Sequence, residues 1–494
     1  MGPAISMGRR PALVRTSLEC QEGHVDKVVP SAAAAVADVG DGATILLGGF
    51  GVIQGWAASC ILALAAHGPR ALTLVASTPG VGPMSPQLLA ERGLVRKLVA
   101  SFAVYPTQAA PMGDGIKAGR IELDLVPQGT LVERVRAGGA GLAAVYTPTG
   151  AGTEVAHGKE MRLFDGRPHL LEHAIRADVA IVRAHRADRH GNLTYRRGSR
   201  NFNPAFATAA RTTIAEVDEI VEPGALDPET IVTPGIFVDR VVATEHPLDQ
   251  ATLLGLSRRF GKTWDLEARE HTVGPRGLPP DLMARKVARL LRDGEYVNLG
   301  TGLPTLVSDH LNPAQAITLH SENGMLGFGP LADTETVTDI HRYNASGQLV
   351  SGQPGESFSD SAEAFAMARS GRVSTIVLGG FQVSARGDLA NWRVPSSGAG
   401  GIGGAMDLAA GAARIVVMMF HLTRQGASKL VTTCAYPLTA ERCVATVVTD
   451  LCVVDVDDGT FVLRELAPGV RVDDIRAVTD APLRVAPDIR EMAF

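Results

Sequence analysis

The chain has 494 residues, of which 45% are hydrophobic and 20% charged, and its formal net charge is −5. This length suits two or three domains of ~100–200 residues each. The acidic balance and the lack of a basic run argue against a nucleic-acid-binding protein, and no apolar stretch approaches the ~20 residues needed to span a bilayer. Abundant glycine with few aromatic residues favours an α/β enzyme whose sites are built by loops.

The N-terminal segment Met1–Arg15 carries arginines and no acidic residue, as transit peptides do. Pro3 and Pro11 interrupt a helical presequence, so we expect an irregular start and a cytoplasmic protein. The cysteines lack a CxxC pair, which predicts reduced thiols rather than a disulfide or zinc framework. They are Cys20, Cys60, Cys434, Cys443 and Cys452.

Two similar segments lie far apart in the chain. Residues 41–49 and 293–301 each contain an Asp-Gly turn, a short apolar strand and a glycine loop. A helical pattern precedes each of them, over 31–39 and 282–291. Common strand–turn patterns can resemble each other by chance, so this pair alone does not establish a repeat.

A second pair follows in the same order. The apolar run 179–182 leads to Gly191-Asn192-Leu193, and the run 374–378 leads to Gly387-Asp388-Leu389. Chance similarity would leave the shared order unexplained. We therefore infer an internal duplication of one α/β domain.

Residues 246–280, between the two halves, are rich in charge, glycine and proline, which is typical of a linker. We predict a first domain at 18–247, a linker at 248–280 and a second domain at 281–494. Continuous apolar runs predict parallel strands buried on both faces of open sheets. Examples are 71–75, 414–419 and 445–448.

Two patterns in the first half could support chemistry. Gln128 follows the predicted strand 121–126, and an amide at a strand end can donate to a developing oxyanion, although an ordinary turn residue fits equally well. The run His169-Leu170-Leu171-Glu172-His173 matches H-x-x-E-H, which on a helix can bind zinc. No third ligand suggests itself, so we favour a surface helix without a metal.

One carboxylate stands out in the second half. The apolar run 317–320 ends at Ser321-Glu322-Asn323-Gly324, just before a glycine-rich turn. Strand ends followed by tight turns are where α/β folds place reacting groups. The pattern leaves open whether Glu322 is a general base, a metal ligand or a nucleophile.

Two further segments border predicted helices. Ser357, Ser359 and Ser361 suggest a helix N-cap with an acidic first turn. The glycine-rich loop 398–404 precedes a helix at 405–408 but does not follow directly on a strand, so it is not a dinucleotide fingerprint. Its amides could bind an anion or an oxyanion, and a flexible loop is the simpler interpretation.

Several ordered motifs extend over nearly the whole chain. They are 41–51, 127–134, 136–141, 146–150, 200–203, 298–304, 321–324, 387–392 and 403–408. In these motifs the sequence resembles the succinyl-CoA:3-oxoacid CoA-transferases, class I CoA-transferases in which α-like and β-like subunits are fused.

The resemblance implies two open α/β CoA-transferase domains with the site at their interface, a homodimer, and no metal. It implies that Glu322 is the nucleophile and that Gln128 and the backbone amide of Gly404 form an oxyanion hole. No tightly bound cofactor is expected, because the coenzyme A thioester is a substrate. We expect further substrate or CoA contacts at Asn323, Gly324, Gly403, Gly300, Gly302, Gly49 and Gly51.

In the implied reaction, Glu322 takes CoA from an acyl-CoA, for which succinyl-CoA is expected, and passes it to a 3-oxo acid such as acetoacetate. A carboxylate keeps donor, glutamyl-CoA intermediate and product nearly isoenergetic, whereas serine or cysteine would retain the acyl group and discard CoA. Two alternatives stay open: hydrolysis of acyl-CoA through the same anhydride, and a non-catalytic acyl-CoA-binding protein.

The sequence departs from the family pattern at 52–58, 77–79 and 104–115. These segments lie on loops expected to border the acid. We therefore predict a different or broader 3-oxo acid, with a more apolar chain near Trp56, Tyr105 and Met112.

Overall fold

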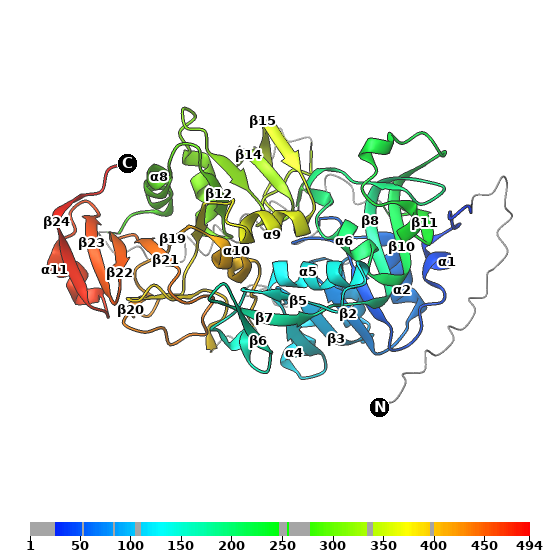
Figure 1. The fold of residues 1–494 in the computed structure, drawn as a ribbon, viewed down its shortest axis with the longest axis horizontal. Coiled ribbons are helices and arrows are strands. Elements are labelled where there is room, and N and C mark those ends of the chain that lie inside the picture. Colours follow the sequence, from blue (N-terminus) through cyan, green and yellow to red (C-terminus); the bar gives the residue numbers. More distant parts are fainter. Residues whose placement is uncertain are drawn as a thin grey trace.

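The computed structural model describes residues 25–51, 54–82, 84–103, 110–246, 254–255, 277–332, 339–395 and 400–494. Two α/β domains lie along the long axis of the molecule, the N-terminal one on the right of Figure 1 and the C-terminal one on the left. Helices α5 (Gln128–Gly139), α9 (Ser361–Arg369) and α10 (Ala405–Gly411) contact one another between them (Figure 1). Most of the predicted linker lies outside the described residues, so the domain boundaries stay predictions.

The N-terminal domain is built on a sheet with strand order β11-β10-β8-β1-β2-β3-β4, in which all these neighbours are parallel. Its strands are β1 (Thr44–Leu47), β2 (Leu72–Ala76), β3 (Val95–Ala100), β4 (Glu122–Leu125), β8 (Ala177–Asp188), β9 (Leu193–Thr194), β10 (Ala210–Val221) and β11 (Arg240–Ala243). The helices of this domain besides α5 are α1 (Ala32–Val36), α2 (Ala58–His67), α3 (Gln87–Glu91), α4 (Pro111–Lys117) and α6 (Asn203–Ala207), with 3-10 turns η1 (Glu154–Ala156), η2 (Arg197–Ser199), η3 (Pro228–Thr230) and η4 (Gly235–Phe237). A small antiparallel sheet joins β5 (Ala144–Thr147), β7 (Arg167–His173) and β6 (Met161–Phe164).

The C-terminal domain has a longer, mixed sheet of order β15-β14-β13-β12-β16-β19-β21-β22-β23-β24. Its strands are β12 (Tyr296–Leu299), β13 (Thr318–His320), β14 (Met325–Leu331), β15 (Val350–Phe358), β16 (Thr375–Leu378), β19 (Arg414–Met418), β21 (Val444–Val448), β22 (Cys452–Asp457), β23 (Thr460–Leu466) and β24 (Leu483–Glu491). The other elements are α8 (Pro280–Leu290), η5 (Leu303–His310), α11 (Val472–Val478) and the small sheet of β17 (Gln382–Ser384), β18 (Leu389–Ala390) and β20 (Leu430–Val431). The central part of this sheet is parallel and consists of β13, β12, β16, β19 and β21. This arrangement confirms the predicted α/β fold with a mostly parallel sheet in each half.

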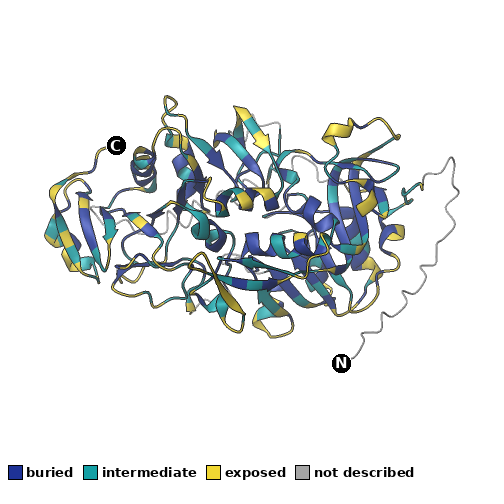
Figure 2. Cartoon of the chain, in the orientation of Figure 1, coloured by how far each residue is buried: buried dark blue, intermediate teal, exposed yellow. Residues whose placement is uncertain are grey.

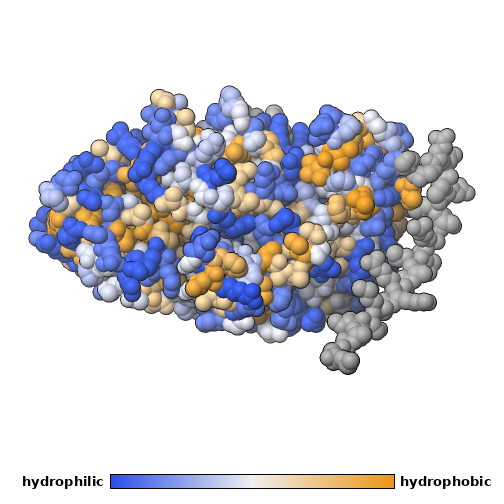
Figure 3. Space-filling view, in the orientation of Figure 1, coloured by the Kyte–Doolittle hydropathy of each residue, from blue (hydrophilic) through white to orange (hydrophobic). Residues whose placement is uncertain are grey.

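The central strands are buried on both faces, as predicted for continuous apolar runs. In β1, Leu46 packs into one hydrophobic cluster while Ile45 and Leu47 pack into another, because successive side chains of a strand point to opposite faces. Figure 2 shows buried strands at the centre of both domains, and Figure 3 shows mainly hydrophilic side chains over the visible surface. The cluster around Leu46 also contains Tyr343 and Phe365 of the C-terminal domain, so the two domains share a core.

The strand register supports the duplication. Leu46 of β1 lies opposite Val75 of β2, and Asn298 of β12 lies opposite His320 of β13. In the sequence alignment of residues 41–49 with 293–301, Leu46 corresponds to Asn298. It follows that β2 and β13 are equivalent strands with the same register.

Two local predictions were wrong. The H-x-x-E-H run lies in strand β7, not on a helix, and Glu172 accepts a hydrogen bond from Lys159 Nζ at 2.6 Å. Within the described ranges, no group of three or more His, Cys, Asp or Glu side chains could hold a metal ion. The helix near Ser361 is capped by Asp360 rather than by a serine, because the Asp360 side chain accepts from Glu363 N at 2.9 Å.

The predicted helices at 31–39 and 282–291 correspond to α1, which is shorter than predicted, and to α8, which begins two residues earlier. No helix in the described part of the chain is long and apolar enough to cross a membrane.

Candidate active site

Glu322 lies in the tight turn that connects β13 to the antiparallel β14. Ser321 N donates to Met325 O at 2.8 Å, and Gly324 N donates to Ser321 O at 3.0 Å. Gly324 has a φ of 101°, and a Cβ there would lie 2.0 Å from Ser359 O. Glycine is thus required at 324 by the backbone of the turn. The turn places Glu322 at the carboxyl end of a parallel strand pair, where α/β folds bind ligands.

The Glu322 carboxyl group is buried and incompletely satisfied. The residue is 5% exposed, and its Oε2 has no hydrogen-bond partner among the described residues. Burial raises the pKa of Glu322 from 4.5 to about 7, and its own backbone N–H and the Asn298 amide oppose that rise. Desolvation rather than a neighbouring negative charge therefore makes the carboxylate less stable and more reactive.

The uncharged side chain of His320 supports the Glu322 turn through hydrogen bonds. Asn298 Nδ2 donates to His320 Nδ1 at 3.1 Å and to His320 O at 3.2 Å, and His320 Nε2 donates to Ala364 O at 3.0 Å. Burial lowers the pKa of His320 to about 4, so the ring is uncharged at neutral pH. No imidazolium is therefore present at His320 to stabilise the Glu322 carboxylate. Asn298 and His320 were not singled out from the sequence as supports of this turn, because their pairing depends on the β12–β13 register.

Gln128 is the first residue of α5 and belongs to a closed ring of hydrogen bonds. Its Nε2 donates to Ser77 Oγ at 2.7 Å, and its backbone N donates to Gly403 O at 2.9 Å. Gly403 N in turn donates to Ser101 O at 3.0 Å, and Ser101 N donates to Ser77 O at 3.1 Å. The ring joins the ends of β2 and β3 to the glycine loop of the other domain.

Gly404 lies next to Gln128. It is the N-cap residue of α10, and a Cβ at this position would lie 3.1 Å from the Phe365 ring and 3.4 Å from Gln128 Oε1. Its backbone N–H has no hydrogen-bond partner in the described ranges. The structure therefore brings Gln128, Gly403 and Gly404 together, with an unused N–H beside an amide side chain. Residues 398–399 of the predicted glycine loop lie outside the described residues.

Helix α9 connects this cluster to the Glu322 turn. Phe365 packs against the position of Gly404, and the neighbouring Ala364 carbonyl accepts from His320, two residues before Glu322. Asn323 Nδ2 donates to Tyr343 O at 2.7 Å, so its amide is used within the protein. Asn323 thus helps to fix the turn.

The other predicted contact residues follow the equivalent strands β1 and β12, and each has a steric or conformational reason to be glycine. A Cβ at Gly49 would lie 2.6 Å from the Trp56 ring, and one at Gly300 would lie 3.1 Å from Val377 O. Gly51 and Gly302 have φ values of 59° and 83°. These observations explain the glycines without a ligand, and their role as substrate contacts stays a prediction.

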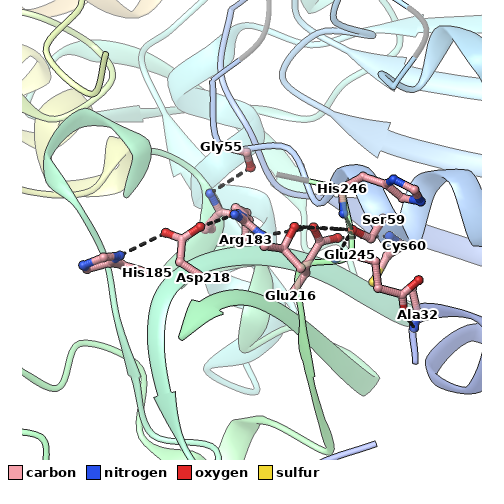
Figure 4. Close-up of polar contacts among 12 residues, drawn as sticks. Ala32, Gly55, Ser59, Cys60, Arg183, His185, Glu216, Asp218, Glu245 and His246 are labelled. Atoms are coloured by element: carbon pink, nitrogen blue, oxygen red, sulfur yellow. Dashed lines mark hydrogen bonds and ion pairs between the residues drawn. The ribbon is translucent and has the colours of Figure 1, made fainter. Parts of the chain in front are cut away.

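A cavity of about 120 Å³ lies beside residues 54–58, which belong to a segment where the sequence departs from the family pattern. Figure 4 shows the polar network on one of its walls, where Arg183 donates to Glu216 at 3.0 Å and also pairs with Asp218. Residues from both domains line it, among them Gln54, Trp56, Arg196, Ser199 and His341. Charged and apolar side chains both line the cavity. Val52, Ile53 and Tyr105 lie outside the described residues.

Comparison with known proteins identifies the family. The Coenzyme A transferase family model matches residues 29–244 and 281–477. Human mitochondrial succinyl-CoA:3-ketoacid coenzyme A transferase 2 is 40% identical over 477 residues, which cover 92% of this chain and 90% of the relative. One subunit of the 3-oxoadipate CoA-transferase of Pseudomonas putida is 48% identical over 219 residues, 44% of this chain and 94% of that subunit.

The fold agrees with these matches. The acyl-CoA transferase YdiF of Escherichia coli O157:H7, solved as a thioester complex with CoA, superposes with a TM-score of 0.75 at 21% identity over 95% of both chains. The human relative spans both halves of this chain, while the Pseudomonas polypeptide matches less than half of it. These findings confirm the resemblance found in the sequence: the chain belongs to the coenzyme A transferase family, in its succinyl-CoA:3-ketoacid branch, with both subunit-like halves in one polypeptide.

Proposed function

We propose that this protein transfers CoA from succinyl-CoA to a 3-oxo acid through a covalent intermediate on Glu322. The observation that carries the proposal is the buried Glu322 carboxylate, whose Oε2 is unpaired among the described residues and whose pKa is raised to about 7. A weakly solvated carboxylate at a strand end is suited to attack a thioester carbonyl. The full-length similarity to 3-ketoacid CoA-transferases supports the same conclusion.

In the first half-reaction, a Glu322 carboxylate oxygen attacks the thioester carbonyl of succinyl-CoA. The C–S bond breaks and CoA departs as a thiolate. The product on the protein is an anhydride between succinate and Glu322. The thiolate then attacks the Glu322 carbonyl, which releases succinate and forms a glutamyl-CoA thioester. A 3-oxo acid reverses both steps and departs as its CoA thioester, so Glu322 is regenerated without loss of CoA.

Each attack creates an oxyanion, which needs hydrogen-bond donors to stabilise it. Gln128 Nε2 has two hydrogens and uses one for Ser77 Oγ, and the Gly404 N–H has no partner among the described residues. Donors of this kind accelerate reactions because they are already oriented when charge develops. We propose both as the oxyanion hole.

We also propose that the acid binds in the cavity lined by Arg183 and Arg196, which lies beside the polar network of Figure 4. Trp56 and Met112 are packed in the core of the N-terminal domain, at 3% and 0% exposed, and offer little surface to a long apolar chain. Arg196 lines the cavity, and its guanidinium has no ion pair among the described residues. We therefore favour a 3-oxo acid with a second carboxylate, such as the 3-oxoadipate named for the Pseudomonas relative.

Two measurements test the function. Incubation with succinyl-CoA followed by borohydride should reduce Glu322 specifically, and adding a 3-oxo acid before borohydride should prevent the reduction. Binding without reduction would indicate a non-catalytic protein, and steady loss of thioester without an acceptor would indicate a hydrolase. Comparison of kcat/KM for acetoacetate, 3-oxoadipate and longer 3-oxo acids tests the acid, and a clear preference for acetoacetate would reject our choice.

Homodimerisation and a cytoplasmic location also belong to the proposal. The name of the human relative places that relative in mitochondria. Sedimentation of the purified protein and fractionation of its source cells test the two points.

A further inference from the structure

Helix α5, which carries Gln128 at its first position, has no N-cap of its own. The residue before it, Pro127, offers no side-chain hydrogen bond, and its first turn contains no acidic residue. The first N–H groups of a helix need outside partners. Here a partner comes from the other domain: Asp407 Oδ2, on α10, accepts from Gly129 N at 2.8 Å.

Asp407 is fully buried, and its second carboxylate oxygen also accepts hydrogen bonds, from one residue of α5 and from one residue outside that helix. Asp407 Oδ1 accepts from Thr130 Oγ1 at 3.1 Å and from Thr149 Oγ1 at 3.0 Å. Arg369 of α9 lies 3.8 Å from the same oxygen and also pairs with Glu133 of α5. A buried carboxylate with this many donors is held in one orientation.

The contacts are too close to be incidental. A Cβ at Gly129 would lie 2.7 Å from Asp407 Cγ, so the carboxylate touches the α5 backbone directly. Gly129 follows Gln128, and Asp407 lies three residues after Gly404 in the first turn of α10. One side chain therefore connects the two short segments that carry the two proposed oxyanion donors.

We propose that Asp407 is a positioning residue that holds Gln128 and the Gly404 N–H at a fixed separation across the domain interface. This inference rests on the oxyanion role proposed above. Asp407 contacts no reacting atom and acts through the N-terminus of α5. Its loss frees the first turn of α5 and lets Gln128 move relative to Gly404, which weakens transition-state binding more than substrate binding.

The test is a double-mutant cycle of Asp407→Ala with Gln128→Ala, measured as kcat and KM for transfer from succinyl-CoA. We expect Asp407→Ala to lower kcat by up to about 100-fold with little change in KM, because a displacement of about 1 Å can have that effect. The double variant should be no slower than Gln128→Ala alone, since Asp407 acts through Gln128. Asp407→Asn should retain most of kcat, because its amide can accept from Gly129 and donate to the threonine oxygens.

Asp450→Ala is the matched control. Asp450 is another buried carboxylate of the C-terminal domain that accepts a backbone N–H, from His421 at 2.8 Å, and it has no hydrogen bond to α5. We expect it to lower the melting temperature without lowering kcat of the folded protein. If Asp407→Ala does not fold, Asp407→Glu tests the positioning role in its place. Glutamate keeps the charge but moves the carboxylate away from the α5 backbone, so this variant should also have a lower kcat.

The outcomes separate the two proposals. Wild-type kcat in a folded Asp407→Ala or Asp407→Glu variant, or rate losses that multiply in the double variant, would overturn the positioning role. Wild-type turnover in Gln128→Ala would instead overturn the oxyanion role on which it rests.

Discussion

The two halves of this molecule place different residues at one equivalent position. β2 and β13 share their register with β1 and β12, so the residue two places beyond Val75 corresponds to the residue two places beyond His320. In the N-terminal half that residue is Ser77, and in the C-terminal half it is Glu322. Both lie at the carboxyl end of a central parallel strand, and both are buried.

Their surroundings differ in one physical respect. Ser77 Oγ accepts a hydrogen bond from Gln128 Nε2 at 2.7 Å, whereas Glu322 Oε2 has no partner among the described residues. A satisfied hydroxyl fixes a neighbour, and an unsatisfied buried carboxylate is available for reaction. The comparison suggests that duplication supplied two similar strand ends, one of which now supports the oxyanion donor while the other attacks the thioester.

The largest effect should come from removing the carboxylate. We expect Glu322→Gln to lower kcat for CoA transfer on the order of 10⁴-fold or more, because loss of a covalent nucleophile leaves only binding and the oxyanion hole. Succinyl-CoA binding should survive. Ser321→Ala, which changes the adjacent side chain, serves as the control. Substantial transfer by Glu322→Gln would show that the two strand ends do not differ in the way proposed.

The next largest effect should come from removing Gln128, the proposed oxyanion donor whose side chain is held by Ser77. Gln128→Ala should lower kcat by about 10²–10³-fold, the usual effect of removing one such donor. Circular dichroism and the melting temperature should show that the fold is retained. Steady-state kinetics with succinyl-CoA measure the effect, and unchanged turnover would remove Gln128 from the mechanism.

A smaller loss is expected from Ser77→Ala. The Gln128 amide would lose its acceptor in a buried site and would no longer be held in one orientation. We expect kcat to fall by about 10-fold, with most of the effect absent when Gln128 is already alanine. Ser85→Ala, a change in the loop beyond β2 at a hydroxyl bonded to Gly82 O, is a control that should leave kcat unchanged.

The pKa of Glu322 predicts opposite pH dependences of activity and stability. Because only the carboxylate attacks, kcat/KM should rise with pH and level off above about 7. Burial raises the folded pKa above the unfolded value of 4.5, so the stability associated with this group is full below about 4.5 and is lost as the pH rises through about 7.

Glu322→Gln removes this ionisation, so the variant should be more stable than the wild type at pH 8 by up to about 3 kcal/mol. The two proteins should converge near pH 4.5. Denaturant unfolding at several pH values measures the difference. Equal stability at pH 8 would indicate that Glu322 is well solvated in the folded protein.

Local sequence patterns were most reliable where one residue type carries a conformational or chemical requirement. The turn at Gly324 and the isolated carboxylate at Glu322 follow from the amino acids themselves, and so do the continuous apolar runs of β16 and β19. The H-x-x-E-H run failed because its histidines lie in a strand of a small sheet, where pairing with β5 and β6 overrides the local pattern. The cap of α9 was misplaced by one residue because serine and aspartate are both good N-caps.

The order of motifs along the chain was enough to predict a duplicated α/β protein, and the resemblance of these motifs to the CoA-transferases added Glu322, Gln128 and Gly404 as its candidate site. Repeated motifs, glycine turns and apolar runs are local properties, so they can be read before the chain is folded. Three findings needed the folded molecule: Ser77 corresponds to Glu322, Ser77 holds Gln128, and Asp407 caps α5 from the other domain. These contacts join residues up to 278 positions apart, and because they depend on strand register and domain packing, no local pattern encodes them.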